Sequence, residues 1–259
     1  MSKYSFIFVL CFLLLSCKRD KEPEAQCETA CECVSEEMTC YWELAWNYPV
    51  EPGTEEWKEL GIQGRLDACQ IPEDVLSSLS TADLTEICLQ YPLLIDLLAF
   101  NCKDEGIDRL FINFNGIREL FKREEASKEL LKRYRCLMQS ISILGDPNAD
   151  GKGKLVINIA IMNLILSRYH SQNDNAIGNY RDILRHLLCC REKVSVYSDE
   201  FIYLGVEDNY FSRANIIVKM SPQSMEKFPN GDKYGVFCSG ADDKKYLDIV
   251  DELSYQLIK

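Results

Sequence analysis

Hydrophobic residues recur with a helical spacing of three to four positions over most of the first half of the chain. These apolar stripes are short, and proline, glycine or polar clusters separate them. The pattern predicts brief helices over residues 27–46, 66–70, 72–79, 93–100, 104–114, 117–123 and 127–143, and two more that begin at Thr54 and Ser80.

Two of these helices carry clear start signals. Thr54 can accept a hydrogen bond from the first turn of a helix that contains Glu55 and Glu56, and acidic residues favour a helix N-terminus. Ser80 and Asp83 have the spacing of a capping box.

The second half of the chain begins with a longer hydrophobic run. Residues 155–166 are apolar on all sides except at Asn158 and Asn163. A helix needs about 20 residues to cross a bilayer, so this run predicts a buried core helix. Residues 175–190 are amphipathic and predict a partner helix for it.

The hydrophobic period changes after Lys193. Residues 194–196, 201–206, 215–220 and 234–238 are rich in β-branched and aromatic side chains, and a turn sequence at 229–232 precedes the last of them. We therefore expect a small antiparallel sheet here. The predicted fold is mainly α: a multi-helix array with a small C-terminal antiparallel β element and a closing helix over 242–257.

The N-terminus has the pattern of an export signal. Lys3 precedes an unbroken apolar run over residues 6–15, which ends at Ser16-Cys17. This junction resembles the signal of bacterial lipoproteins, in which a small residue precedes the cysteine that receives the lipid. The resemblance implies that residues 1–16 are removed and that Cys17 is lipidated. The alternative is an ordinary signal that is cleaved nearby, with Cys17 an incidental thiol.

The rest of the chain divides into four expected parts: a charged tether (17–26), a helical region (27–144), a polar linker (145–154) and a C-terminal part (155–259). A lipid on Cys17 would place the protein at the bacterial cell envelope, at the outer membrane or in the periplasm. The formal net charge of −12 disfavours nucleic acid and anionic lipid headgroups as partners, so membrane contact would come from the lipid alone.

The chain has 13 cysteines, which is many for 259 residues. An exported protein can form disulfides, but the odd number left after Cys11 and Cys17 requires at least one free thiol. Cys189 and Cys190 are adjacent and are not expected to pair with each other. The cysteines between residues 27 and 40 lack a Cys-x-x-Cys spacing, so burial or pairing with distant cysteines is favoured over a zinc site.

One loop resembles a metal site. Asp146, Asn148, Asp150 and Gly151 match the first, third, fifth and sixth positions of a calcium loop. The twelfth position is Ile157, where such a loop needs a bidentate glutamate. A polar linker is therefore the favoured interpretation, calcium binding is the alternative, and no cofactor is expected.

Catalytic motifs are absent from the sequence: it has no His-Glu-x-x-His, no Gly-x-Ser-x-Gly and no phosphate-binding loop. The two histidines, His170 and His186, are interpreted as structural. Asp96 stands out because it lies within the apolar segment 93–100. A buried acid there would have a raised pKa and would mark a site, whereas a paired or solvent-facing acid is the favoured interpretation.

Four segments carry a second resemblance: YPVEPGTEEW at 48–57, LDACQIP at 66–72, YPL at 91–93 and NFNG at 113–116. They are similar to a group of uncharacterised bacterial cell-envelope lipoproteins or secreted proteins. The likeness covers residues 48–138 and weakens beyond them. It implies a helical N-terminal region and transfers no activity and no site residue.

These observations predict a lipid-anchored, non-catalytic binding or assembly module at the cell envelope, with an unknown protein or glycan as partner. The alternative is an envelope or glycan hydrolase that uses two carboxylates, one of them Asp96.

Overall fold

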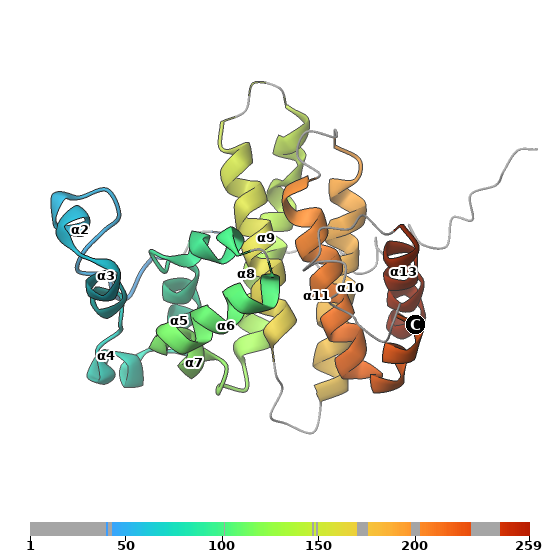
Figure 1. Cartoon of the computed structure of the whole chain (residues 1–259), viewed down its shortest axis with the longest axis horizontal. Helices are drawn as coiled ribbons and strands as arrows, with labels where there is room; N and C mark the ends of the chain where they lie inside the picture. Colours follow the sequence, from blue (N-terminus) through green and yellow to red (C-terminus); the bar gives the residue numbers. More distant parts are fainter. Residues whose placement is uncertain are drawn as a thin grey trace, which may run out of the picture.

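The structure is a computed structural model that describes residues 40, 43–100, 102–146, 148, 150–169, 176–197, 203–228 and 244–259. The regular elements of this part are all helices, and along the long axis of the molecule they extend from α2 at one end to α13 at the other, with α11 between α9 and α10 (Figure 1). Their bounds are α2 Glu55–Glu59, α3 Ile62–Ala68, α4 Glu73–Ser78, α5 Thr81–Leu89, η2 Leu94–Ala99, α6 Lys103–Asn113, α7 Asn115–Leu120, α8 Ala126–Gln139, η3 Ser140–Gly145, α9 Lys152–Arg168, α10 Ala176–Val194, α11 Tyr203–Met220, η4 Pro222–Lys227 and α13 Lys244–Ile258.

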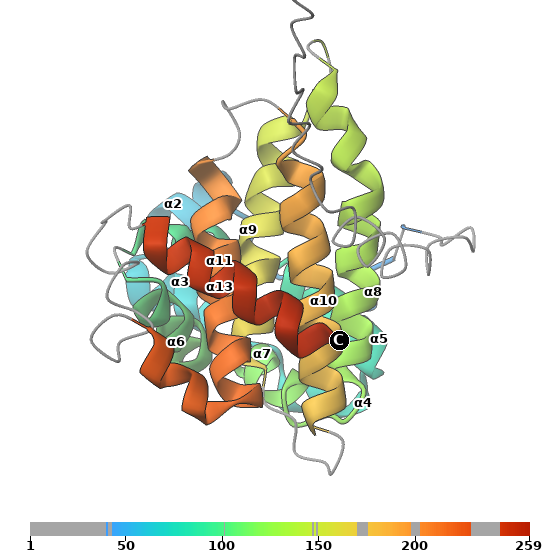
Figure 2. The ribbon, with the colours of Figure 1, turned by 90° about the vertical axis from the view of Figure 1, so that its right-hand side faces the viewer.

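The long helices of the second half form the thickest part of the molecule. The most extensive helix–helix contact joins α9 and α11, and α11 also packs against α10, α13 and η4. Seen from the C-terminal side, α13 crosses over α10 and α11 (Figure 2). One hydrophobic core runs from Tyr48 to Ile258 and joins this bundle to the short helices of the first half.

The expected β element is wrong in the part of the chain that the structure describes. Residues 203–220 form one helix, α11, where two strands were predicted, and residue 194 ends α10. Every described side chain from Asn209 to Ile217 is buried, because α11 lies among α9, α10 and α13. The buried side chains include the polar Asn209, Ser212, Arg213 and Asn215, so exposure does not separate a polar face from an apolar one. Tertiary packing overrides the strand preference of the β-branched residues. Residues 234–238 lie outside the described residues.

The prediction of a core helix at 155–166 is confirmed. It is part of α9, in which Asn163 is fully buried and accepts a hydrogen bond from the Tyr134 hydroxyl at 2.6 Å. The expected helix over 175–190 is α10, and the closing helix is α13. Among the described residues, the structure holds no helix whose length and apolar character would suit a bilayer crossing.

The predicted helix starts at Thr54 and Ser80 are also confirmed. The Thr54 hydroxyl accepts a hydrogen bond from the Trp57 amide at 3.2 Å, and the Ser80 hydroxyl accepts one from the Asp83 amide at 3.1 Å. The expected helix over 93–100 is the 3₁₀ helix η2. Of the expected helix over 27–46, residues 40 and 43–46 are described and are not helical.

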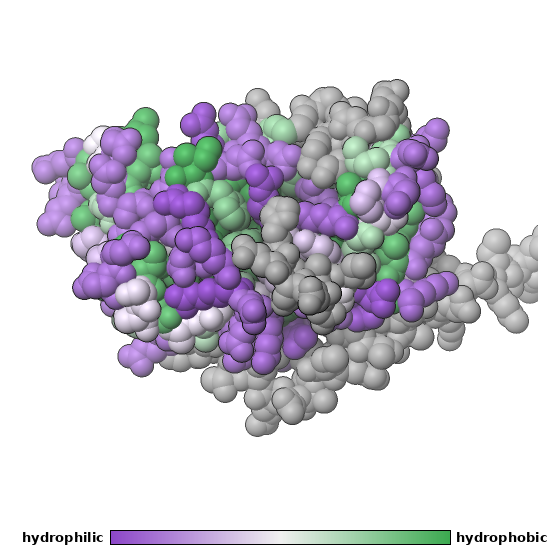
Figure 3. Space-filling model, turned by 90° about the horizontal axis from the view of Figure 1, so that it is seen from below, coloured by the Kyte–Doolittle hydropathy of each residue, from purple (hydrophilic) through white to green (hydrophobic). Residues whose placement is uncertain are grey.

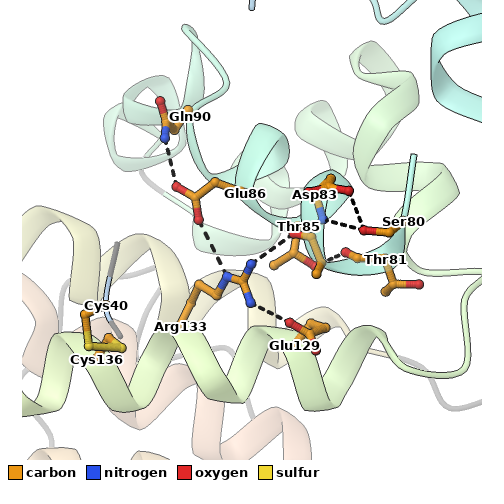
Figure 4. A network of polar contacts seen from close by, with 11 residues as sticks. Cys40, Ser80, Thr81, Asp83, Thr85, Glu86, Gln90, Glu129, Arg133 and Cys136 are labelled. Carbon is orange, nitrogen blue, oxygen red and sulfur yellow. Dashed lines mark hydrogen bonds and ion pairs between the residues drawn. A yellow bond between two sulfur atoms is a disulfide. The ribbon is translucent and has the colours of Figure 1, made fainter. Parts of the chain in front are cut away.

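A buried arginine joins the two halves of the helical region. Arg133 of α8 is 4% exposed and forms ion pairs with Glu86 of α5 and Glu129 of α8 (Figure 4). It also donates a hydrogen bond to the Ala82 carbonyl at 3.0 Å. This network fixes α5 against α8.

The cysteines include both disulfides and buried thiols. Cys40 pairs with Cys136 of α8, 96 positions away, and Cys102 and Cys189 are also disulfide-bonded. Cys190 is a free, buried thiol, so the adjacent cysteines do not pair with each other, as expected. Cys69 and Cys88 are the other free thiols of the described part, and burial raises the pKa of Cys69 to about 11.

Candidate functional site: a pocket between α3, η2 and α6

The short helices of the first half enclose a pocket of about 420 Å³. Pockets that bind small molecules usually have volumes of roughly 300–1,000 Å³. The residues that line it come from α3, from the segment before η2, from η2 and its C-terminal end, and from α6: Ile62, Arg65, Leu66, Tyr91, Leu93, Asp96, Leu97, Phe100, Gly106, Arg109, Leu110 and Asn113.

A glycine lets α6 approach η2 closely along one wall of the pocket. A Cβ atom on Gly106 would lie 2.7 Å from the carbonyl oxygen of Leu97 and 3.1 Å from the Phe100 ring. Only a residue without a side chain allows this approach, and Gly106 therefore sets the spacing of the two helices that form this wall.

Arg65 is held in place at the α3 side of the pocket. Its Nε donates a hydrogen bond to the Trp57 carbonyl at 3.1 Å, and its guanidinium carbon lies 5.3 Å from the centre of the Trp57 ring. Stacking on an aromatic ring and one hydrogen bond limit the motion of the side chain. The two terminal nitrogen atoms of Arg65 have no hydrogen-bond or ion-pair partner among the described residues.

The α6 side carries a second arginine, Arg109, which is exposed. Asp96 of η2 is the only acidic residue among the described residues that line the pocket. It is exposed to solvent. The structure therefore agrees with the solvent-facing interpretation of Asp96, at the edge of a pocket with two guanidinium groups.

Tyr91 contributes a buried hydroxyl group. The residue is 5% exposed, and its hydroxyl oxygen has no hydrogen-bond partner among the described residues. Burial is the main cause of its raised pKa, and the charges of Cys69 and Asp96 add to the effect. The group therefore keeps its proton at neutral pH and is a hydrogen-bond donor without an acceptor.

Two amide side chains behind the pocket connect the end of α3 to the junction of α6 and α7. Gln70 donates a hydrogen bond from Nε2 to the Asn113 carbonyl at 2.7 Å, and its Oε1 accepts one from the Asn115 amide at 3.1 Å. The Asn115 side chain in turn bonds both the amide and the carbonyl of Ile71. These bonds bring the LDACQIP and NFNG segments together.

Aromatic rings bring the two remaining segments to the same place. Tyr91 of YPL stacks on Phe114 of NFNG with ring centres 4.1 Å apart, and Tyr48 lies 6.2 Å from Tyr91. The Tyr48 hydroxyl donates a hydrogen bond to the Ile87 carbonyl at 2.9 Å. The four segments therefore form one structural unit, and the pocket opens on its surface.

Exposed hydrophobic residues lie on the same three helices. Ile62 of α3 is 82% exposed, Ile112 of α6 is 67% exposed and Ile95 of η2 is 55% exposed. In the described part of the chain, Val196 is the only other large hydrophobic residue with such exposure. In the view from below, hydrophobic residues form separate patches on the surface between hydrophilic ones (Figure 3). Some of these patches lie at the end of the molecule that carries α2 to α4. Exposed apolar groups beside a pocket are typical of a binding surface.

The other predicted site residues lie away from this pocket. Asp146, Asn148 and Asp150 are exposed in the loop before α9, and the Asp146 carboxylate accepts a hydrogen bond from the Asn148 amide at 2.9 Å. Within the described ranges, no three His, Cys, Asp or Glu side chains are grouped as metal ligands. Cys17 and His170 lie outside the described residues.

His186 is buried in α10 and makes two structural contacts. Its Nδ1 lies 2.6 Å from the Asp182 carbonyl, and Arg135 of α8 donates a hydrogen bond to its Nε2 at 3.0 Å. Nε2 must be unprotonated to accept this bond, so the proton is on Nδ1 and the ring is neutral. Burial is the main cause of the lowered pKa of His186.

No protein-family model, curated protein or solved structure matches this chain. The chemistry of the site therefore has to be inferred from its geometry. Two arginines, one acid and an apolar wall can bind a small molecule and orient it, but the described lining has no histidine, no cysteine and no second carboxylate for acid–base or nucleophilic catalysis.

Of the lining residues, only Asp96 stands out in the sequence as a candidate site residue. Arg65, Tyr91 and Asn113 lie within or next to the four segments, which was the one sequence signal that pointed to this region. Arg109 had no such signal, because a single arginine on a polar helix face does not differ from a solvated charge.

Proposed function

We propose that the chain is a lipid-anchored protein of the bacterial cell envelope whose helical body binds a ligand without transforming it. The observation that carries the proposal is the Ser16-Cys17 junction at the end of the apolar run 6–15. A thioether-linked diacylglyceryl group adds two acyl chains, and two chains are enough for stable membrane attachment.

Two further observations support a binding role. The segment 18–26 is charged and contains Pro23, which suits a tether that holds a folded body away from the bilayer. The pocket between α3, η2 and α6 has a suitable volume and an amphipathic lining.

The alternative, a hydrolase with two carboxylates, has less support. Such enzymes place two carboxyl groups about 5–9.5 Å apart on either side of the scissile bond. Asp96 is the only acid among the described lining residues. An assay of the purified protein on envelope polymers tests this alternative: turnover that Asp96→Asn abolishes would establish the hydrolase and overturn the binding role.

Metabolic labelling with a palmitate analogue tests the anchor. We expect the wild-type protein to incorporate the label and to sediment with membranes, and the Cys17→Ala variant to do neither. Cys11→Ala is the matched control, because it also removes one thiol from the N-terminal region but leaves the lipidation site intact. Label in the Cys17→Ala protein would contradict the proposal.

A further inference from the structure

We infer that the pocket between α3, η2 and α6 binds a small organic anion with an apolar chain. This inference rests on the proposed function, because it names the ligand class of a binding module. It concerns only the pocket, so it can fail while the lipid anchor stands.

The apolar lining defines one half of the ligand. Six of the described lining residues are Ile, Leu or Phe, and they come from three different helices and their ends: Ile62, Leu66, Leu93, Leu97, Phe100 and Leu110. An apolar group that fills a cavity of about 420 Å³ with such walls removes apolar surface from water, which favours binding. Ile62, one of these lining residues, is 82% exposed, so the apolar lining continues to the protein surface, which favours a chain over a compact group.

The two arginines define the other half. The whole chain has a formal net charge of −12, whereas the described lining has two guanidinium groups and one carboxylate. A guanidinium group binds a carboxylate or phosphate through two parallel hydrogen bonds. Trp57 fixes Arg65 in two ways: its carbonyl accepts the hydrogen bond from Arg65 Nε, and its ring packs against the Arg65 guanidinium. The terminal N–H groups of Arg65 are therefore oriented before a ligand binds.

Tyr91 adds a further polar side chain to the lining of the pocket. Its hydroxyl is a protonated donor, it belongs to a 95% buried residue that lines the pocket, and it has no acceptor among the described residues. A buried donor without a partner costs free energy, and a ligand oxygen that displaced the cover of this hydroxyl and accepted its hydrogen bond would remove the cost. Asp96 lies at the same pocket and repels an anion, so it is expected to weaken binding.

Photolabelling of the full chain in isolated membranes tests the inference. The probes are a photoreactive diazirine analogue of decanoate, the corresponding analogue of decyl phosphate and the uncharged analogue of decanol. We expect both anions to label peptides from 62–66, 93–100 or 106–113, and the uncharged alcohol to label them about tenfold less, since hydrogen bonds to charged groups are strong. A difference between the two anions identifies the preferred head group.

Variants of exposed residues separate the contribution of charge from that of folding. Arg109→Gln is expected to reduce labelling by the anions about tenfold, whereas Arg181→Gln, an exposed arginine of α10, leaves it unchanged. Asp96→Asn is expected to increase labelling by the anions. Unchanged melting temperatures of the three variants establish that the fold is intact.

Three results would overturn the inference: equal labelling by the alcohol and the anions, labelling confined to other peptides, or a loss of labelling in Asp96→Asn. The state of Cys17 in the same membranes separates this inference from the proposed function. A protein that is lipidated but not labelled overturns only the ligand class, and one that is labelled but not lipidated overturns only the anchor.

Discussion

Two buried arginines each tie two helices together. Arg213 of α11 is fully buried, donates a hydrogen bond to the Asp251 carboxylate of α13 at 2.7 Å and lies 4.4 Å from the centre of the Tyr210 ring. Arg133 of α8 is also buried, and its ion pair with Glu86 joins α8 to α5. Because these charges are removed from water, the loss of one partner leaves the other unpaired inside the protein.

Substitution of Arg133 by alanine should therefore destabilise the protein strongly. It leaves Glu86 and Glu129, which are 13% and 15% exposed, without their counter-charge. We expect the free energy of unfolding to fall by about 3 kcal/mol, measured by urea denaturation. Arg181→Ala, at an exposed position, should change it by less than about 0.5 kcal/mol. Equal effects of the two substitutions would show that the α5–α8 network contributes no stability.

His186 should make the stability of the protein dependent on pH. Burial lowers its pKa in the folded state below the ordinary value of 6.5, so the unfolded state takes up a proton first as the pH falls. This contribution to stability is fully present above pH 6.5 and is lost as the pH falls from there towards the folded-state pKa. Thermal denaturation between about pH 7.5 and pH 5.5 should show a smaller loss for His186→Gln than for the wild type. Parallel curves for the two proteins would contradict the buried neutral ring.

At the scale of single elements, the sequence predicts helices wherever a local signal marks them. Thr54 and Ser80 cap α2 and α5 through hydrogen bonds within three residues, which depend only on local sequence. In α11 the local signal is misleading, because residues 209–217 are buried on every side, polar and apolar alike, while the β-branched residues at 216–218 locally favour a strand. The pocket could not be predicted from the sequence, since Arg65 and Arg109 line the same cavity only because α3 and α6 pack around η2.

The close approach of α6 to η2 can be tested with two glycines that differ in their surroundings. Gly106→Ala places a Cβ atom 2.7 Å from the Leu97 carbonyl oxygen, and we expect a loss of about 1–3 kcal/mol of unfolding free energy. Gly153 lies in the first turn of α9 with no atom within 4 Å of an added Cβ, so Gly153→Ala should be neutral or stabilise by up to about 1 kcal/mol. Loss of stability in both variants, to the same extent, would contradict the tight α6–η2 contact.

At the scale of the whole molecule, one continuous core joins the short helices of the first half to the bundle of the second, and a disulfide ties the start of the described chain to α8. The Cys40–Cys136 bond closes a loop of 96 positions and so restricts the unfolded chain strongly. Cys40→Ala combined with Cys136→Ala should lower the free energy of unfolding by about 3–4 kcal/mol in urea denaturation. A change within about 1 kcal/mol would show that this bond adds little to the stability of the native protein.

The envelope assignment depends on the new N-terminus. Mass spectrometry of the N-terminal peptide from the native protein, isolated from membranes, tests this claim most directly. We expect the peptide to begin at Cys17 and to carry the added mass of a diacylglyceryl group on its sulfur. A peptide that begins at Met1, or an unmodified Cys17, would contradict the claim.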